Sequence, residues 1–325
     1  MSAAVVTLGE GLISLVAAQP GPLAEAAVFE RHVAGAEANV AVGLARLGRS
    51  VAYIGRVGSD GFGVAIVRRL RAEGVDVRHL SVDTGATTGL MLRERRVLGA
   101  AEVVYARTGS AGSRLSTEDV DRAAADGLFT GTHWLHVTGI TPALSATAHD
   151  AVMRAVELAR GAGLTISFDV NLRRRLWSDA AAAPIVRGLA QQADVVLGSP
   201  DELAVVTGAD AGDPAALARA VLALGATYAV VKLGADGALG ATNGRAPITV
   251  PALPVPSVVD PVGAGDAFSA GFIDARLGDT DLLVALRRAN ACGAAAVTTM
   301  GDLTGLPDAI ELERLLTSGG PDTIR

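Results

Sequence analysis

The chain has 325 residues, of which 50% are hydrophobic and 19% are charged, and its formal net charge at pH 7 is −6. A composition of this kind supports a sizeable buried core, in one large or two smaller domains. The acidic balance argues against a nucleic-acid-binding surface, which needs clustered lysine and arginine side chains.

Neither a membrane segment nor a disulfide is expected. No apolar stretch reaches the roughly 18 residues of a membrane-spanning helix. The apolar run at the N-terminus is interrupted by Glu10 and lacks the basic region of a signal peptide. The single cysteine, Cys292, lies in an alanine-rich stretch and is expected to be a small buried helix residue in a reducing compartment. We therefore expect a cytoplasmic protein without a membrane or nucleic-acid partner.

Short apolar runs alternate along the chain with longer segments in which apolar residues recur at helical spacing. Val40, Leu44 and Leu47, for example, share one helix face. Strands are predicted at residues 5–8, 51–54, 134–137, 164–168, 194–197 and 229–233. Helices are predicted at residues 38–47, 63–73, 146–160 and 214–224, each with a glycine near its end. The repeated strand–helix–strand order predicts an α/β fold with a mostly parallel central sheet flanked by helices.

Two segments depart from this alternation. Residues 11–32 and 87–105 are rich in strand-forming residues without helices between them. They predict a small β-sheet lid outside the main sheet that covers a substrate, a partner chain or both. No tandem repeat or low-complexity linker divides the chain, so one domain over residues 1–325 is expected, with lid strands drawn from about 11–34 and 87–108.

The segment DPVGAGDAF at residues 260–268 is the most informative part of the chain. Gly263, Ala264 and Gly265 form a small-residue turn whose amides can approach an anion at the start of a predicted helix. The free N–H groups and positive dipole end of a helix N-terminus favour a phosphate there. Asp266 follows directly and can accept a proton from a substrate hydroxyl. An anion cradle with a base is the minimum apparatus for phosphorylating an alcohol.

Further polar groups follow predicted strands, which is where ligands bind in open α/β sheets. Asp169, Asn171 and Arg173 alternate along the chain and would project from one side of an extended segment, although a solvated basic turn is the alternative. Tyr105 and Arg107 share one face of a strand, and an arginine fork beside a phenol suits a carboxylate. An edge-strand pair without a ligand explains these two residues equally well.

Three glycine- or serine-containing turns complete the candidate site. GAEAN at 35–39 opens a helix and could contact a ligand, or be no more than a capped helix start. KLGADG at 232–237 allows close approach to phosphates, but a plain hairpin turn would have the same sequence. SPDE at 199–202 is typical of a helix cap, from which Glu202 could reach a hydrated Mg²⁺. The histidines show no metal-ligand spacing, and His136 is expected to be structural.

Together these motifs resemble the ribokinase-like (PfkB) carbohydrate kinase family along essentially the whole chain. GRVGSDGFG at 55–63 is similar to the N-terminal signature region of that family, and residues 260–272 are similar to its highly specific C-terminal signature. Within the family the pattern is most similar to that of 2-keto-3-deoxygluconate kinases. The segments that support this are GAEAN at 35–39, YAR at 105–107 with GSAGS at 109–113, GITPA at 139–143, and DVNLR at 169–173 before LW at 176–177.

The resemblance implies transfer of the γ-phosphoryl group of ATP, with Mg²⁺, to the primary hydroxyl of 2-keto-3-deoxygluconate. It implies that the catalytic groups are Asp266 as the base and Gly263, Ala264 and Gly265 as the anion hole. The substrate contacts that we expect are Gly35, Asn39, Tyr105, Arg107, Asn171, Arg173 and Asp266. The nucleotide contacts that we expect are Ser199, Glu202, Lys232, Gly234, Gly237, Gly263, Gly265 and Asn290, with Glu202 also contacting the metal indirectly.

The charges fit an acid substrate. Two arginines that converge on one site are costly unless an anion joins them, and the substrate carboxylate would be that anion. Neutral-sugar kinases of the family commonly carry an aspartate near Ser14, and its absence here removes a carboxylate that would repel an acid. Met91 stands where related acid kinases often have a tyrosine, so one hydrogen bond to the substrate is expected to be missing. Gluconate and galactonate configurations of the substrate both remain open.

Two other functions are compatible with the pattern. The chain could phosphorylate a neutral sugar such as fructose or ribose, or act as a non-catalytic sensor of a sugar acid or nucleotide. The intact Asp266 and glycine turn argue against a sensor. A dinucleotide dehydrogenase is disfavoured because no G-x-G-x-x-G follows the first strand. Since exposed lid strands can pair with another chain, a homodimer or higher oligomer through the lid is expected.

Overall fold

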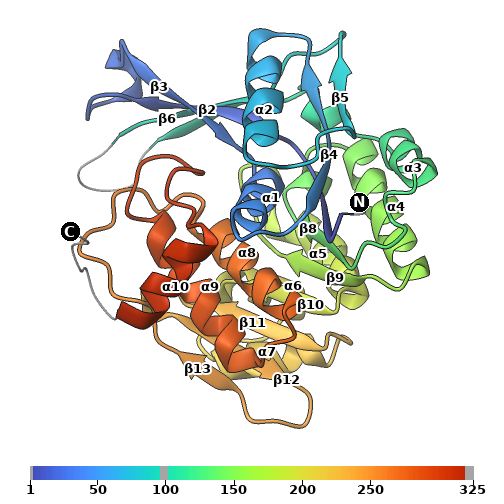
Figure 1. Ribbon diagram of the computed structural model, residues 1–325, viewed down its shortest axis with the longest axis vertical. Helices are drawn as coiled ribbons and strands as arrows, with labels where there is room; N and C mark the ends of the chain where they lie inside the picture. The colour runs from blue at the N-terminus through green and yellow to red at the C-terminus, as the bar shows by residue number, and fades with distance from the viewer. Residues whose placement is uncertain (1–2, 96–101, 319–325) are drawn as a thin grey trace.

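Two sheets organise the protein, whose computed structural model describes residues 3–95 and 102–318 (Figure 1). Over these residues the large sheet has nine strands in the order β13-β12-β11-β10-β9-β8-β1-β4-β5. In chain order they are β1 (Val5–Leu8), β4 (Val51–Gly58), β5 (Leu80–Asp83), β8 (Trp134–Thr138), β9 (Thr165–Asp169), β10 (Val195–Gly198), β11 (Tyr228–Lys232), β12 (Ala238–Thr242) and β13 (Ile248–Val250). From β11 to β5 all neighbours are parallel.

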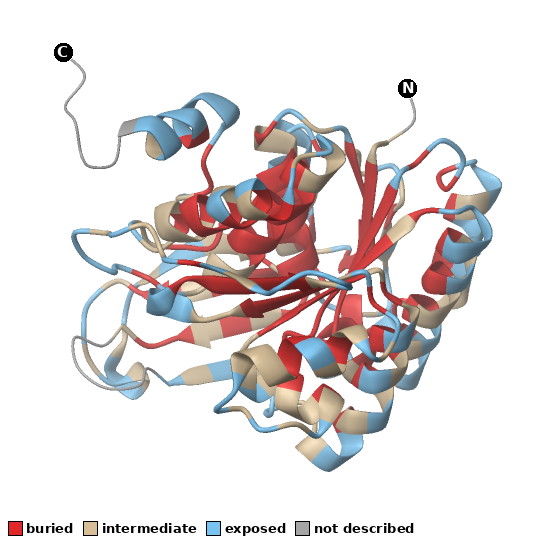
Figure 2. Ribbon diagram, turned by 90° about the horizontal axis from the view of Figure 1, so that it is seen from below, coloured by how far each residue is buried: buried red, intermediate tan, exposed pale blue. Residues whose placement is uncertain are grey.

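The helices cover both faces of this sheet, as strands buried on both sides require. One face packs against α3 (Thr117–Ala125), α4 (Ala146–Gly161), α5 (Asp179–Gln192), α6 (Pro200–Thr207) and α7 (Pro214–Leu222). The other packs against α1 (Ala36–Arg46), α2 (Gly61–Ala72), α8 (Ala264–Leu277) and α9 (Leu282–Ala296), and α10 (Ala309–Ser318) packs on α9. Figure 2 shows the buried strands between helices whose outer sides are exposed. Within the described residues, every helix falls short of the length and apolarity needed to cross a membrane.

A small sheet projects from the body next to α2 (Figure 1). Its strands, in spatial order, are β3 (Phe29–Ala34), β2 (Leu12–Ala17), β6 (Leu90–Arg93) and β7 (Val103–Ala106). β2 and β6 run parallel, whereas the other two pairs are antiparallel. The prediction of a separate small sheet from the two helix-free segments is therefore confirmed.

The α/β fold class is also confirmed, and each predicted strand and helix is present. The edge formed by β12 and β13 departs from the parallel arrangement, because β12 returns antiparallel to β11. A short turn joins β11 to β12 and ends at Gly237, whose φ of 99° is favourable only for glycine. The hairpin interpretation of KLGADG is therefore correct for the backbone.

Two residues that were expected to be structural are buried in the core. His136 on β8 is fully buried and lies 2.8 Å from the hydroxyl of Ser167. Burial lowers the pKa of His136 to about 3, so this imidazole stays neutral. Cys292 is buried on α9, and burial raises the pKa of its thiol to about 12. Neither side chain is available for chemistry at neutral pH.

Candidate active site

A cavity of about 450 Å³ lies where the carboxyl ends of the parallel strands meet the small sheet. The chain leaves β1, β8, β9, β10 and β11 at this edge, which is where open α/β sheets bind ligands. The residues that line the cavity are Glu10, Leu12, Ala34, Gly35, Ala36, Glu37, Asn39, Met91, Tyr105, Arg107, Ile140, Asn171, Arg173, Ser199, Glu202, Lys232, Gly234, Pro261, Val262, Gly263, Gly265, Asp266 and Asp302.

The predicted anion turn lies at the N-terminus of α8, which begins at Ala264. Gly263 caps this helix with a φ of 83°, and a Cβ there would lie 3.1 Å from the carbonyl oxygen of Asp302. Glycine is required on both counts. The first-turn amides of a helix have no intrahelical acceptor, so the N–H groups of Gly265 and Asp266 are available to an anion, whereas that of Ala264 donates to the carbonyl oxygen of Pro261 at 3.4 Å.

Asp266 lies in the first turn of α8 and is held from two directions. Asn39 on α1 donates to its Oδ2 at 2.8 Å, and Asn171 donates to its Oδ1 at 3.3 Å. Burial raises the pKa of Asp266 to about 7; the hydrogen bond from Asn39 opposes this shift, and the charge of Asp169 adds to it. A carboxylate with a pKa near neutrality is suited to general base catalysis. Since the backbone of Asn171 has a φ of 37°, the loop is held in an uncommon conformation beside this carboxylate.

Lys232 brings a positive charge to the same place. Its Nζ lies 2.6 and 2.8 Å from the two carboxylate oxygens of Asp169, which also accepts a hydrogen bond from Ser269 at 2.9 Å. Burial by itself would lower the pKa of Lys232, but the charges of Asp169, Glu202 and Asp266 outweigh it and the pKa is raised. A Cβ at Gly265 would lie 3.4 Å from Nζ, so the ammonium group faces the anion turn.

Arg107 does not enter the cavity as an unpaired cation. Its Nε lies 2.6 Å from Oε2 of Glu10, which is completely buried and also pairs with the second arm of the guanidinium group. Ser110 donates to the other oxygen of Glu10 at 2.5 Å. The argument that two converging arginines need a substrate anion therefore does not apply to Arg107, because Glu10 already compensates its charge. Arg173, by contrast, is exposed to the cavity and makes no ion pair with any residue that the structure describes.

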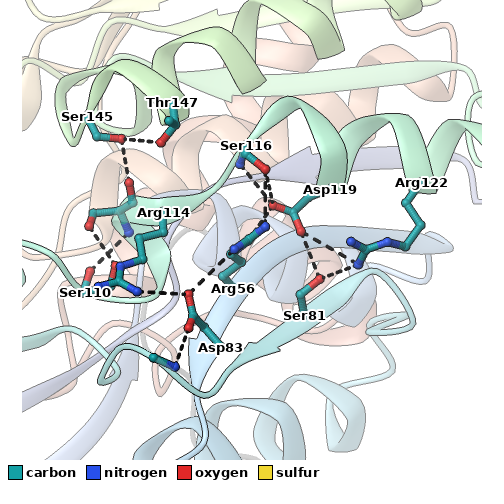
Figure 3. Close-up of polar contacts among 12 residues, drawn as sticks. Arg56, Ser81, Asp83, Ser110, Arg114, Ser116, Asp119, Arg122, Ser145 and Thr147 are labelled. Carbon is teal, nitrogen blue, oxygen red and sulfur yellow. Dashed lines mark hydrogen bonds and ion pairs between the residues drawn. The ribbon is translucent and has the colours of Figure 1, made fainter.

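Polar contacts attach the segment after β7 to α4, and a neighbouring ion pair joins β4 to α3 (Figure 3). Ser145, which caps α4, donates to the carbonyl oxygen of Ser113 at 2.6 Å. Arg56 on β4 lies 2.6 Å from the carboxylate of Asp119 on α3.

The ring of Tyr105 and the side chain of Met91 lie together in the cavity wall. Met91 is the cross-strand partner of Tyr105 in the small sheet, and the guanidinium carbon of Arg107 lies 5.4 Å from the centre of the tyrosine ring. Ser14, which is paired with Met91 in the register of β2 and β6, is buried and does not line the cavity. The position on β2 that reaches the cavity is Leu12.

Most of the predicted site residues meet in this one cavity, but three do not line it. The amide of Asn290 is used to hold the end of β13, since it donates to the carbonyl oxygens of Val250 and Pro251. Gly237 packs against the backbone of β13, where a Cβ would lie 2.1 Å from the oxygen of Val250. The third, Ala264, supplies only a backbone amide to the turn.

Glu202 lines the cavity with both carboxylate oxygens already engaged. It accepts hydrogen bonds from the backbone of Ser199 at 2.8 Å and of Leu172 at 2.9 Å, so it closes the predicted helix cap. Among the residues that the structure describes, no group of three or more His, Cys, Asp or Glu could hold a metal ion.

Sequence reasoning missed three carboxylates that line the cavity, Glu10, Glu37 and Asp302. Asp302 accepts a hydrogen bond from Asn39 at 3.2 Å and lines the cavity next to Asp266. Glu10 was noticed only as an interruption of an apolar run. Directly after a predicted buried strand, such a charged residue is itself a signal of a site, because buried charges need a partner.

Comparison with known proteins agrees with this geometry. A model of the pfkB family of carbohydrate kinases matches residues 2–309. The chain is 42% identical over 316 residues to a 2-dehydro-3-deoxygluconokinase of Thermoproteus tenax, covering 96% of this chain and 94% of the relative. It is 38% identical over 315 residues to a 2-dehydro-3-deoxygluconokinase of Bacillus subtilis, covering 96% and 95%. A putative ribokinase II of Escherichia coli, solved with ATP and Mg²⁺, has a TM-score of 0.89 at 29% identity and covers 98% of this chain and all of that one. The chain belongs to the pfkB family of carbohydrate kinases.

Proposed function

We propose that this kinase transfers the γ-phosphoryl group of ATP to the primary hydroxyl of 2-keto-3-deoxygluconate, giving 2-keto-3-deoxy-6-phosphogluconate. The observation that carries the proposal is the position of Asp266, a carboxylate with a pKa raised to about 7, in the first turn of the helix that presents the anion turn. The relatives named 2-dehydro-3-deoxygluconokinase support the choice of acceptor.

In the proposed reaction Asp266 accepts the proton of the substrate hydroxyl while the new bond from oxygen to the γ-phosphorus forms. The bond between the γ-phosphorus and the bridging oxygen breaks, and ADP leaves. Amides after Gly263 and the ammonium group of Lys232 stabilise the charge on the transferring phosphoryl oxygens. Asn39 and Asn171 keep the base in place.

The acid end of the substrate is proposed to bind Arg173, with Arg107 and Tyr105 beside it. Arg107 contributes orientation and hydrogen-bond donors more than net charge, because Glu10 already balances it. Arg173 makes no ion pair with a described residue of this wall, although its charge acts to lower the pKa of the nearby Asp266. The Oδ1 atom of Asn39 is buried and accepts no hydrogen bond from the described residues, which makes it an acceptor for a substrate hydroxyl.

ATP and Mg²⁺ are proposed as co-substrate and cofactor, in line with the ribokinase relative that was solved with both. The residues present fit a metal that arrives with the nucleotide, since the wall offers Glu202 as a carboxylate that water can bridge. When bound, Mg²⁺ neutralises phosphate charge. Ser199, Lys232 and Gly234 line the cavity and are proposed to contact the nucleotide phosphates.

The experiment that tests the proposal is ADP release from Mg-ATP with 2-keto-3-deoxygluconate and fructose as parallel acceptors. Strong preference for the acid is expected. Activity on fructose alone would overturn the acid site and leave a neutral-sugar kinase of the same family. Absence of turnover with both acceptors would favour another acceptor or a non-catalytic sensor.

We also propose that two copies associate through the small sheet. β3 and β7 are its edge strands over the described residues, and unpaired strand edges favour pairing with another chain. Sedimentation at working concentration is expected to show at least a dimer, and a monomer would contradict the proposal.

A further inference from the structure

A buried ion pair connects the small sheet to the start of the anion turn. Arg93, the last residue of β6, has a side chain that is 9% exposed, and its Nη2 lies 2.6 Å from Oδ1 of Asp260. Asp260 is 2% exposed and comes directly before the turn. This contact joins residues 167 positions apart in the chain.

Asp260 shapes the turn through its own backbone contacts. Its Oδ1 accepts a hydrogen bond from the N–H of Val262 at 3.1 Å, and its Oδ2 accepts one from the N–H of Gly301 at 3.2 Å. The carboxylate therefore fixes the approach to Gly263 and the loop that contains Asp302. The guanidinium group of Arg93 compensates the negative charge of the buried Asp260 carboxylate.

The second arm of Arg93 faces the carboxylate next to the base. Nη1 lies 3.7 Å from Oδ1 of Asp302, and neither atom has a hydrogen-bond partner among the described residues. Asp302 accepts at its other oxygen from Asn39, and the same amide group of Asn39 donates to Asp266. Arg93 thus reaches the base through two side chains.

Stability alone is a poor explanation for this arrangement. Burying a guanidinium group and two carboxylates carries a desolvation penalty, and apolar side chains of similar volume often hold two elements together as well or better. An ion pair fixes direction, however, because its donors and acceptors must align. That directional property matters where the amides of the turn and the base have to meet one phosphoryl group.

We propose that Arg93 is a positioning residue for phosphoryl transfer: from the small sheet it orients the anion turn through Asp260 and the base through Asp302 and Asn39. The inference rests on the proposed phosphoryl transfer but not on the identity of the acceptor. Arg93 does not line the cavity, so its effect is expected on turnover and not on binding of the acceptor.

The test compares three variants in the full-length enzyme. Arg93→Met is expected to lower kcat by about 10- to 100-fold while KM for the acceptor changes less than about threefold, and Arg93→Lys is expected to recover part of kcat. Arg49→Met is the matched control. Arg49 pairs at 2.7 Å with Asp274, which lies on α8, the helix that also carries Asp266. Asp274 lies about 12 Å along that helix from Asp266, at 1.5 Å per residue. This control is expected to lower the melting temperature with kcat unchanged.

Combining Arg93→Met with Asp260→Asn separates positioning from general loosening. If Arg93 acts through Asp260, the double variant loses no more kcat than the worse single variant, whereas independent effects multiply. Unchanged kcat of folded Arg93→Met, or an equal loss of kcat in Arg49→Met, would overturn the inference. All assays use whichever acceptor the wild-type enzyme phosphorylates, so a wild type that prefers fructose would refute the acid substrate and still test Arg93.

Discussion

Glu10 and Arg107, 97 positions apart in the chain, form a buried ion pair in the wall of the cavity, with Nε of the arginine 2.6 Å from the carboxylate. Glu10 follows β1 of the large sheet, and Arg107 follows β7 of the small sheet. The pair therefore joins the two sheets at the place where the acid end of the substrate is proposed to bind. Arg107 therefore has a structural role in addition to its proposed role in substrate binding, and mutations can separate the two.

Arg107→Ala is expected to affect both roles. Removing one partner of a buried pair leaves an uncompensated charge and typically costs about 3–5 kcal/mol of stability, so the melting temperature should fall. KM for the sugar acid should rise as well, because a donor to the carboxylate is lost. Adding Glu10→Gln to this variant should restore much of the melting temperature but not KM, and recovery of both would mean that Arg107 has no role in binding.

The sequence was sufficient to predict the mostly parallel central sheet, the separate small sheet and the small-residue turn before Asp266, because each depends on local patterns. Alternating strands and helices predicted the parallel sheet, and the small residues before Asp266 predicted the turn at a helix N-terminus. The contact between Asn39 and Asp266 was not predictable, since it joins positions 227 apart. Only the packing of α1 against α8 brings them together.

Some residues were assigned to the ligand although the same local sequence can also serve the packing of the fold. KLGADG belongs both to a hairpin and to the cavity: Gly234 lines the cavity, whereas Gly237 packs against β13. The amide of Asn290 was assigned to the nucleotide, but it holds a strand end. The argument that two converging arginines need an anionic ligand does not apply to Arg107, because Glu10 pairs with it.

Asp266→Asn is expected to lower turnover by about 10²–10⁴-fold, the usual contribution of a general base. Stability should not fall with it. Because burial raises the pKa of Asp266 from 3.8 to about 7, the folded protein keeps a proton between these pH values that the unfolded chain has lost. The contribution of this group to the free energy of unfolding therefore decreases as the pH rises to about 7. The asparagine of the variant does not titrate, so the variant does not lose stability in this way. The melting temperature of the variant at pH 8 should equal or exceed that of the wild type, and near-normal turnover would exclude Asp266 as the base.

The pH dependence of the wild-type enzyme should report the same group. The ionised form of Asp266 accepts the proton, so kcat/KM is expected to rise tenfold per pH unit in the acid range and to level off above a pH of about 7. Rate measurements from pH 5 to 9 at saturating Mg-ATP would show this limb. The residual activity of Asp266→Asn should not show this rise of kcat/KM with pH. The same rise in that variant would assign the titration to another group.

Arg173→Met tests whether the cavity is built for an acid. A charge-assisted hydrogen bond contributes about 1.5–3 kcal/mol, so KM for the sugar acid should rise by about 10- to 100-fold, while kcat at saturation should change little. Arg174→Met is the matched control, because the neighbouring arginine is exposed and pairs with Asp179 at 2.8 Å outside the cavity. Its KM is expected to match that of the wild type. If both variants raise KM equally, the basic segment acts through its general charge, and the assignment of the carboxylate to Arg173 is wrong.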